Sequence, residues 1–140
     1  MKNKRILFVT SNFPRWEGDS ITPFVLHLAE DLQALGWKVD VLAPHAAPAV
    51  SHEVLGGVNV DRFRYLWPAS WETVCYQGGA LINLKNSRSN YIKLPALAFF
   101  EWVAIAKRLM RGKYDFLHSH WMLPQGFTGV LAASLLGYLM

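Results

Sequence analysis

Two histidines one residue apart, His118 and His120, are the clearest candidates for chemistry in this sequence. They end the run that begins at Tyr114, which has the composition of a strand, and alternate residues of a strand point to the same side. Both imidazoles could therefore face one ligand. An imidazole can hydrogen-bond a substrate hydroxyl near neutral pH, bind a metal ion, or serve the structure alone. These interpretations stay open here, and a metal site would need a third ligand, which the spacing of the other three histidines does not indicate.

A second candidate is the polar loop between Asn12 and Ser20, which lies between an apolar run and an amphipathic segment. Gly18 would let backbone N–H groups approach a phosphate or a sugar closely, although an isolated glycine can equally mark a tight turn. Asp19 would repel an anion, so we expect its carboxylate to cap the next helix or to accept sugar hydroxyls. The sequence contains neither G-x-G-x-x-G nor a P-loop pattern, which argues against dinucleotide-binding and P-loop proteins.

The residues that follow His120 could complete a sugar-binding surface. Trp121 supplies a flat apolar ring and Gln125 supplies an amide, a combination typical of sugar recognition. Pro124 and Gly126 could equally mark the start of a helix.

Strands and helices alternate along the chain and must position both candidates. Short apolar runs predict strands at 5–10, 38–43 and 114–119. Helical spacing with start and stop residues predicts helices at 23–35, 95–110 and 124–136. This alternation predicts an α/β fold with a parallel sheet and flanking helices, in which both candidates lie at the carboxyl edge of the sheet.

The middle and the end of the chain are less regular. An alternating pattern around Gly56-Gly57 predicts a hairpin over 54–65, and a long loop is predicted over 66–90. Residues 138–140 would begin another strand, so we expect a truncated chain.

Composition excludes several classes of protein. Apolar residues make up 52% of the 140 residues and aromatic residues 14%, which is enough for a folded core and argues against a disordered tail. The sequence contains no apolar run of about 18 residues and no signal-peptide pattern. The single cysteine, Cys75, cannot form a disulfide within the chain. We therefore expect a cytoplasmic protein.

Positive charge is concentrated in one block. Residues 85–113 hold seven of the 14 Lys and Arg but only one of the ten Asp and Glu. The segment from Tyr91 to Lys113 is apolar with a basic end, so it could be a core helix or a peripheral membrane contact at the inner face. We do not expect nucleic acid as a partner, because the block lacks interleaved exposed aromatics and a recognition motif.

Three groups of motifs occur in a fixed order, each beside a predicted strand end. They are Asn12-Phe13-Pro14-Arg15-Trp16-Glu17-Gly18-Asp19 with Pro23-Phe24-Val25, Leu35-Gly36-Trp37-Lys38-Val39-Asp40-Val41-Leu42-Ala43-Pro44, and Asp115-Phe116-Leu117-His118-Ser119-His120-Trp121 with Leu123-Pro124-Gln125-Gly126. As a set they resemble the N-terminal half of family 4 glycosyltransferases.

The resemblance implies a GT-B enzyme with two Rossmann-like domains facing across a cleft, and retaining transfer from a nucleotide-sugar donor. It implies no cofactor and no obligatory metal. It also implies that the N-terminal domain mainly holds the acceptor, a sugar or a lipid-linked molecule. By the same resemblance, His120 contacts the transferred sugar, His118 is structural, and Gly18 belongs to the loop near the donor phosphates. The usual paired glycines are replaced here by Glu17-Gly18-Asp19.

The C-terminal domain of such enzymes, with its basic donor-binding residues and E-x7-E motif, has no counterpart in this sequence. We therefore expect residues 1–140 to form a single acceptor-side domain that is inactive alone, since charge on the leaving diphosphate needs stabilisation. The alternative is a non-catalytic module that docks a separate catalytic domain or a membrane surface. A metal hydrolase built on His118 and His120 is a third interpretation.

Overall fold

The computed structural model describes residues 4–20, 23–47, 49–76, 80–112, 114–120 and 127–136. The strands of this part of the chain form one sheet in the order β3-β4-β2-β1-β5. All neighbours pair in parallel except β3, which is antiparallel to β4. The strands are β1 (Arg5–Val9), β2 (Lys38–Pro44), β3 (His52–Leu55), β4 (Val58–Phe63) and β5 (Phe116–Ser119).

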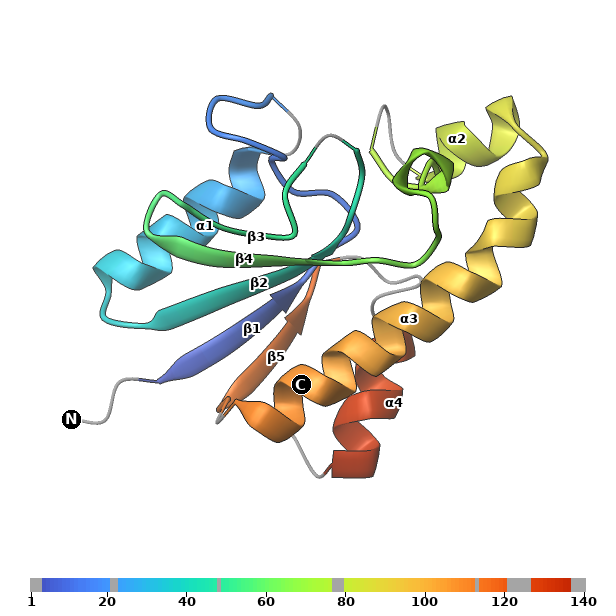
Figure 1. The fold of residues 1–140 in the computed structure, drawn as a ribbon. Helices are drawn as coiled ribbons and strands as arrows, with labels where there is room; N and C mark the ends of the chain where they lie inside the picture. The colour runs from blue at the N-terminus through green and yellow to red at the C-terminus, as the bar shows by residue number, and fades with distance from the viewer. Residues whose placement is uncertain are drawn as a thin grey trace.

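Helices cover both faces of this sheet. One face carries one helix and the other carries two, which produces the layered arrangement in Figure 1. The predicted α/β class is therefore confirmed: the fold is Rossmann-like, with a mostly parallel sheet and flanking helices. The helices are α1 (Pro23–Ala34), α2 (Ala80–Asn86), α3 (Ser89–Arg111) and α4 (Phe127–Leu136), with a 3-10 turn at Ala69–Trp71.

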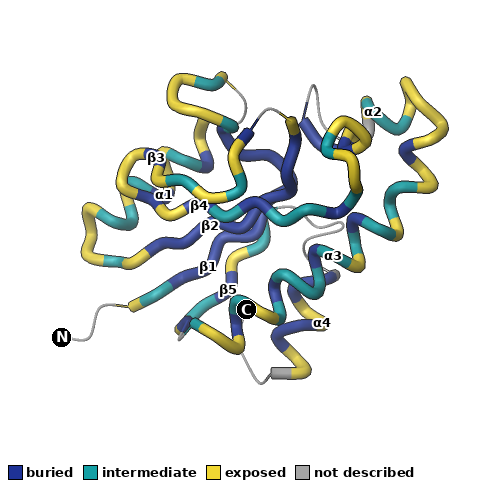
Figure 2. The backbone as a smooth tube through the Cα atoms, viewed as in Figure 1, coloured by how far each residue is buried: buried dark blue, intermediate teal, exposed yellow. Residues whose placement is uncertain are grey.

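The alternation of side chains along β1 divides the core between the two faces. Phe8 packs with Val25 of α1, whereas Leu7 packs with Ile105 of α3 and with Ala132 of α4. Figure 2 shows the resulting buried centre, where the strands run between the helical layers. A strand buried on both faces is read in sequence as a continuous apolar run, which is why β1 could be predicted.

The predicted end of α1 and the predicted turn of the hairpin are confirmed, although the hairpin strands span 52–55 and 58–63 rather than 54–65. Gly36 has a positive φ of 91°, and it donates its N–H to Gln33 while Trp37 donates to Leu32, the hydrogen bonds of a Schellman C-cap. Gly56 and Gly57 connect β3 to β4 with φ values of 56° and 77°. Positive φ at both residues is the requirement of a two-residue type I′ turn.

The long loop predicted over 66–90 is wrong in part, because this region contains the 3-10 turn, α2 and the start of α3. Side-chain amides hold these helices. Asn83 donates to the carbonyl oxygens of Val74 (3.0 Å) and Tyr76 (2.7 Å), and Asn90 donates to that of Asn83 (2.9 Å). Asparagine predicts turns in sequence, so these tertiary hydrogen bonds were not visible in the local pattern.

The helix predicted to begin at Pro95 begins at Ser89, and Pro95 lies inside α3. A proline within a helix removes the hydrogen bond to the carbonyl four residues earlier, here that of Tyr91. Tyr91 is exposed, so water can reach that region of the backbone. The predicted helix start at Pro124 and the strand predicted at 138–140 lie outside the described residues.

Candidate functional site

The carboxyl ends of β1 and β5 form the natural site for a ligand in this topology. From β1 the chain crosses to β2 through α1 on one face, and from β4 it crosses to β5 through α3 on the other face. The direction of winding therefore reverses between β1 and β5, whose ends lie together in Figure 1. Open α/β sheets bind ligands outside the strand ends at such a switch point.

Both predicted histidines lie at this switch point. His118 is paired in register with Phe8 of β1, and the backbone N–H of His120 donates to the carbonyl of Val9 (3.0 Å). The two imidazoles stack with their centroids 4.4 Å apart, and the Phe8 ring contacts each of them at 5.2 and 4.6 Å. The prediction that the two histidines face the same side is therefore confirmed.

The surroundings of His120 favour its neutral form. Burial, together with the neighbouring His118, lowers the pKa of His120 to about 4, and burial also lowers the pKa of His118. The Nε2 atom of His120 is buried and has no hydrogen-bond partner among the described residues. A buried polar atom without a partner is costly, so this nitrogen is well placed to bind a ligand hydroxyl.

The β1–α1 loop forms the other side of the switch point. The Asp19 carboxylate accepts hydrogen bonds from the backbone N–H of Arg15 (3.0 Å) and from its Nε (2.8 Å). The Arg15 guanidinium lies 4.4 Å from the centroid of the Trp16 ring. Gly18 is exposed, with φ of 83°, and no described atom lies within 4 Å of the place that a Cβ would occupy. Gly18 is therefore required by backbone conformation rather than by lack of space.

Buried polar side chains fix this loop to the rest of the fold. The side-chain oxygen of Asn12 accepts a hydrogen bond from the N–H of Tyr76 (2.8 Å). Arg62, on β4, donates to the carbonyls of Pro14 (2.6 Å) and Val50 (2.9 Å). The loop is thus held in place at its first half, while Gly18 at its tip remains open to solvent.

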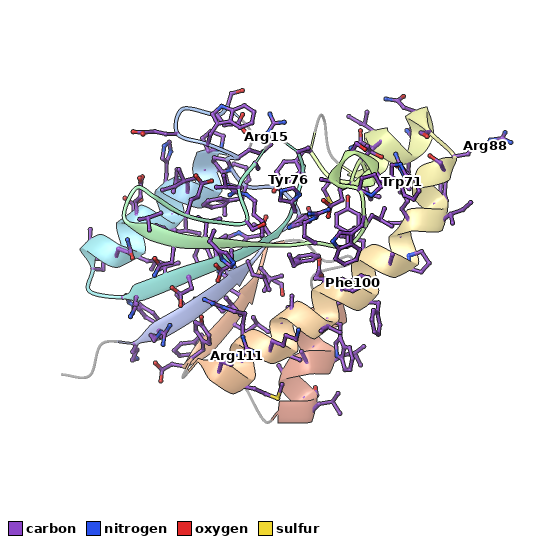
Figure 3. The ribbon with its side chains drawn as sticks, in the orientation of Figure 1. Arg15, Trp71, Tyr76, Arg88, Phe100 and Arg111 are labelled. Carbon is purple, nitrogen blue, oxygen red and sulfur yellow. The ribbon has the colours of Figure 1, made fainter. Side chains whose placement is uncertain are left out.

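A pocket of about 190 Å³ adjoins the loop. Arg15 lies in its wall and also 5.7 Å from the Tyr76 ring, and Figure 3 shows these two side chains next to each other. Burial raises the pKa of the Cys75 thiol in the same wall, so this thiol stays protonated. The remaining lining residues are small or polar: Ala46, Ala47, Ala69, Ser70, Glu72 and Thr73.

A larger hollow of about 440 Å³ lies elsewhere, on the side of the sheet opposite α1. Its charged residues pair with one another. Asp40 accepts hydrogen bonds from Arg5 (2.7 Å) and from the Tyr114 hydroxyl (2.6 Å), and Arg108 lies 2.6 Å from Asp61. These ion pairs and hydrogen bonds hold the strands together and attach α3 to the sheet.

The sequence was compared with known protein families. Residues 21–138 match the Glycosyl transferase 4-like domain. The chain belongs to this family. A search of curated proteins gave no match. The matched segment of this glycosyltransferase 4-like domain includes His118 and His120 and begins just after the loop that contains Gly18.

The structure brings together only some of the residues predicted for the site of the glycosyltransferase 4-like domain. His120 and His118 lie at the end of β5, and Gly18 and Asp19 lie in the loop after β1. Asp19 is engaged with Arg15 rather than turned to solvent. The predicted sugar-binding residues Trp121 and Gln125 lie outside the described residues.

Sequence reasoning missed Arg62 and Tyr76, which fix the loop of the glycosyltransferase 4-like domain. Arg62 could have been found, because the strand pattern places it on the same side as the buried Val58 and Val60. An arginine on the apolar side of a strand needs acceptors, here carbonyl oxygens and Glu53. Tyr76 has a positive φ of 72°, which nothing in the sequence indicates.

No helix of the described part of the glycosyltransferase 4-like domain has the length and hydrophobicity needed to span a membrane. Among the same residues, no group of three or more His, Cys, Asp or Glu side chains is arranged to hold a metal ion.

Proposed function

We propose that this chain is the acceptor-side domain of a retaining GT-B glycosyltransferase that moves a sugar from a nucleotide-sugar donor to a sugar or lipid-linked acceptor. Membership of the family supports glycosyl transfer, and the position of His120 at the switch point supports this site. The observation that carries the proposal is the buried Nε2 of His120, which has no hydrogen-bond partner among the described residues.

The proposed role of His120 is to bind a hydroxyl of the transferred sugar. In the transfer, the bond between the anomeric carbon and the donor phosphate breaks, and a bond to the acceptor oxygen forms on the same face of the sugar. The acceptor proton leaves with the diphosphate. A neutral imidazole suits this role, because it can donate or accept a hydrogen bond without placing positive charge beside the oxocarbenium-like carbon.

We assign the pocket beside Arg15 to part of the acceptor. Its volume of about 190 Å³ is below the ~300–1,000 Å³ of whole ligand sites, so it would hold one end of the acceptor. Ser70 in its wall offers a hydroxyl, and Arg15, which is stacked on Trp16 and paired with Asp19, adds a polar guanidinium to the same wall. These groups suit a hydroxylated acceptor rather than a purely apolar one.

The Gly18 loop would face the donor diphosphate. Its open backbone allows N–H groups to approach phosphate oxygens, and the pairing of Asp19 with Arg15 reduces the repulsion that a free carboxylate would cause. A leaving diphosphate carries more than one negative charge, so its stabilisation calls for cationic groups as well as backbone N–H groups. The proposal therefore includes a C-terminal domain that supplies basic donor-binding residues, and it includes inactivity of this chain alone.

The direct experiment is a transfer assay with the full-length protein. The protein is incubated with a panel of nucleotide sugars and hydroxylated acceptors, and release of the nucleoside diphosphate is measured. We expect release with one donor class that depends on the acceptor. A folded protein that releases no nucleotide from any donor would overturn the proposal and favour the alternative, a non-catalytic module that docks a separate catalytic domain.

A further inference from the structure

Helix α3 is apolar on two opposite sides. Leu97, Ile105 and Leu109 face the core and are buried. Ile92 and Met110 lie on the opposite side and are 82% and 65% exposed. A helix on the surface of a globular protein usually presents polar residues on that side.

The exposed apolar residues form a continuous stripe. Phe99 follows Ile92 by seven residues, and Met110 follows Phe99 by eleven, which are about two and three helical turns. Val103, which is half-buried, lies between them on the same side. The 23 residues of α3 extend about 34 Å, so this outer stripe, made of Ile92, Phe99, Val103 and Met110, runs along most of that length.

Aromatic rings extend the stripe toward the end of β4. Phe99 contacts the rings of Phe100 and Trp102, and Phe100 contacts the ring of Trp67 with centroids 5.3 Å apart. Trp67 is 57% exposed. Figure 2 shows exposed segments recurring along α2 and α3. Tryptophan and phenylalanine beside a charged flank are typical of the side of a helix that enters a lipid interface.

The charge around the stripe has one sign. The sequence contains no Asp or Glu between Glu72 and Glu101, and none between Glu101 and Asp115. Glu101 is completely buried, and its carboxylate accepts a hydrogen bond from Thr128 of α4. Among the described residues of α2 and α3, the exposed ionised side chains are therefore basic.

Basic residues flank the outer stripe on one side and at both ends. Lys93, Lys107 and Arg111 lie within about 100° of the stripe around the helix axis. Figure 3 shows Arg88 and Arg111 near the two ends of α3, with Arg88 pointing away from the rest of the molecule. Lys107, Arg88 and Arg111 form no ion pair with any described residue.

We propose that the outer stripe of α3 docks on the surface of an anionic lipid bilayer. The stripe would enter the boundary between headgroups and acyl chains with α3 parallel to the surface, and the flanking cations would contact lipid phosphates. Charge complementarity favours this occupant over a second copy of the chain, because two copies would place the same basic flank in one interface. The inference does not depend on the proposed activity.

The test measures binding of the purified full-length protein to vesicles by co-sedimentation. One set contains equal parts of phosphatidylcholine and phosphatidylglycerol, and the other contains phosphatidylcholine alone. We expect binding to the anionic vesicles that weakens as salt rises, and binding to the neutral vesicles that is about tenfold weaker or less. Equal binding to both sets, or no binding to either at low salt, would overturn the proposal.

Two pairs of substitutions locate the surface. Ile92→Ser with Met110→Ser should weaken binding to anionic vesicles about tenfold, because two side chains no longer enter the lipid. Leu35→Ser with Val54→Ser is the matched control, since these residues are 76% and 63% exposed but lie outside α3. All four side chains are exposed, so both variants should fold. Equal binding by the two variants would contradict the assignment of the stripe.

A charge substitution tests the flank. Lys107→Gln should weaken binding to anionic vesicles about fivefold and reduce its salt dependence, whereas Lys38→Gln, which changes an exposed lysine at the start of β2, should do neither.

Sedimentation velocity tests whether a second copy of the chain covers the stripe instead. A dimer that is lost in the Ile92→Ser/Met110→Ser variant, together with no lipid binding, would show that it does. That result would also overturn the proposal.

Discussion

His120 combines two properties that a sugar-binding imidazole needs: a neutral ring, and a buried nitrogen with no hydrogen-bond partner in the described part of the chain. Both follow from its place at the end of β5, where Phe8 and His118 cover the ring. The exposed His27 of α1 has no such cover. The chemistry of His120 is therefore set by packing against neighbouring strands.

The lowered pKa of His120 predicts a specific dependence of stability on pH. Between about pH 6.5 and pH 4, the unfolded state binds a proton at this residue and the folded state does not, so stability falls as pH is lowered through this window. Urea unfolding from pH 7 to pH 4 should show a smaller loss of stability for His120→Gln than for the unmodified protein. His27→Gln should follow the unmodified protein. Parallel curves for the unmodified protein and His120→Gln would contradict the burial of this ring.

Substitutions at Gly18 and Gly36 can distinguish the effect of backbone strain on stability from the effect of a lost donor contact on KM. Gly18→Ala should cost about 1 kcal/mol of stability, because alanine is strained at positive φ, and it should also raise the KM for the donor. Gly36→Ala is the matched control. Gly36 also has a positive φ, 91°, and no described atom lies within 4 Å of the place that a Cβ would occupy, but Gly36 ends α1 and lies outside the loop. Thermal unfolding should show similar losses for both variants, and only Gly18→Ala should change the donor KM. An unchanged KM would place the donor elsewhere.

At the scale of strands and helices, Asp40 joins several elements of the fold. Its side chain on β2 is 1% exposed and lies within hydrogen-bonding distance of Arg5 of β1, Asn59 of β4 and Tyr114. Burial alone would raise the pKa of Asp40, but the hydrogen bonds from Tyr114 and Arg5 hold it below its usual value. The charged form is thus the one that the fold requires.

Asp40→Asn should therefore destabilise the protein by about 2 kcal/mol, because the buried Tyr114 hydroxyl and the half-buried Arg5 lose a charged hydrogen-bond acceptor. Asp31→Asn, at an exposed position of α1, is the control and should change stability by less than about 0.5 kcal/mol. Urea unfolding of both variants measures this difference. A loss below about 1 kcal/mol for Asp40→Asn would show that the network contributes little.

The elements that sequence could predict are those whose own residues determine them. Apolar runs predict β1 and β2, the pair Gly56-Gly57 predicts the hairpin, and Gly36 predicts the end of α1. The first turns of α3 and the whole of α2 depend instead on side-chain hydrogen bonds from Asn83 to Val74 and from Asn90 to Asn83, which lie nine and seven residues away. No periodicity records such contacts, so the region 66–90 was predicted as a loop.

The candidate site divides in the same way. The alternation of strand residues predicted that His118 and His120 face one side, because this depends only on β5. The anchoring of the loop by Arg62 and by the N–H of Tyr76 could not be predicted, since it joins residues 48 and 64 positions apart. The shared orientation of the histidines depends on local sequence, whereas the anchoring of the loop after β1 does not.

The complete fold places the two proposed surfaces on different parts of the molecule. The switch point lies at the carboxyl ends of β1 and β5, whereas the outer stripe lies on the side of α3 that faces away from the sheet. Substitutions in one surface should therefore leave the other intact, since effects of distant sites are usually additive. In particular, Ile92→Ser with Met110→Ser should leave transfer to a water-soluble acceptor unchanged.

The proposed contact between His120 and the transferred sugar is tested by the turnover of the full-length protein carrying His120→Ala. We predict that kcat for glycosyl transfer falls about 100-fold or more, since a hydrogen bond that acts in the transition state is lost, while the protein remains folded. His27→Ala, at an exposed position of α1, should keep normal turnover. Near-normal turnover by folded His120→Ala would contradict the claim that this histidine binds the transferred sugar.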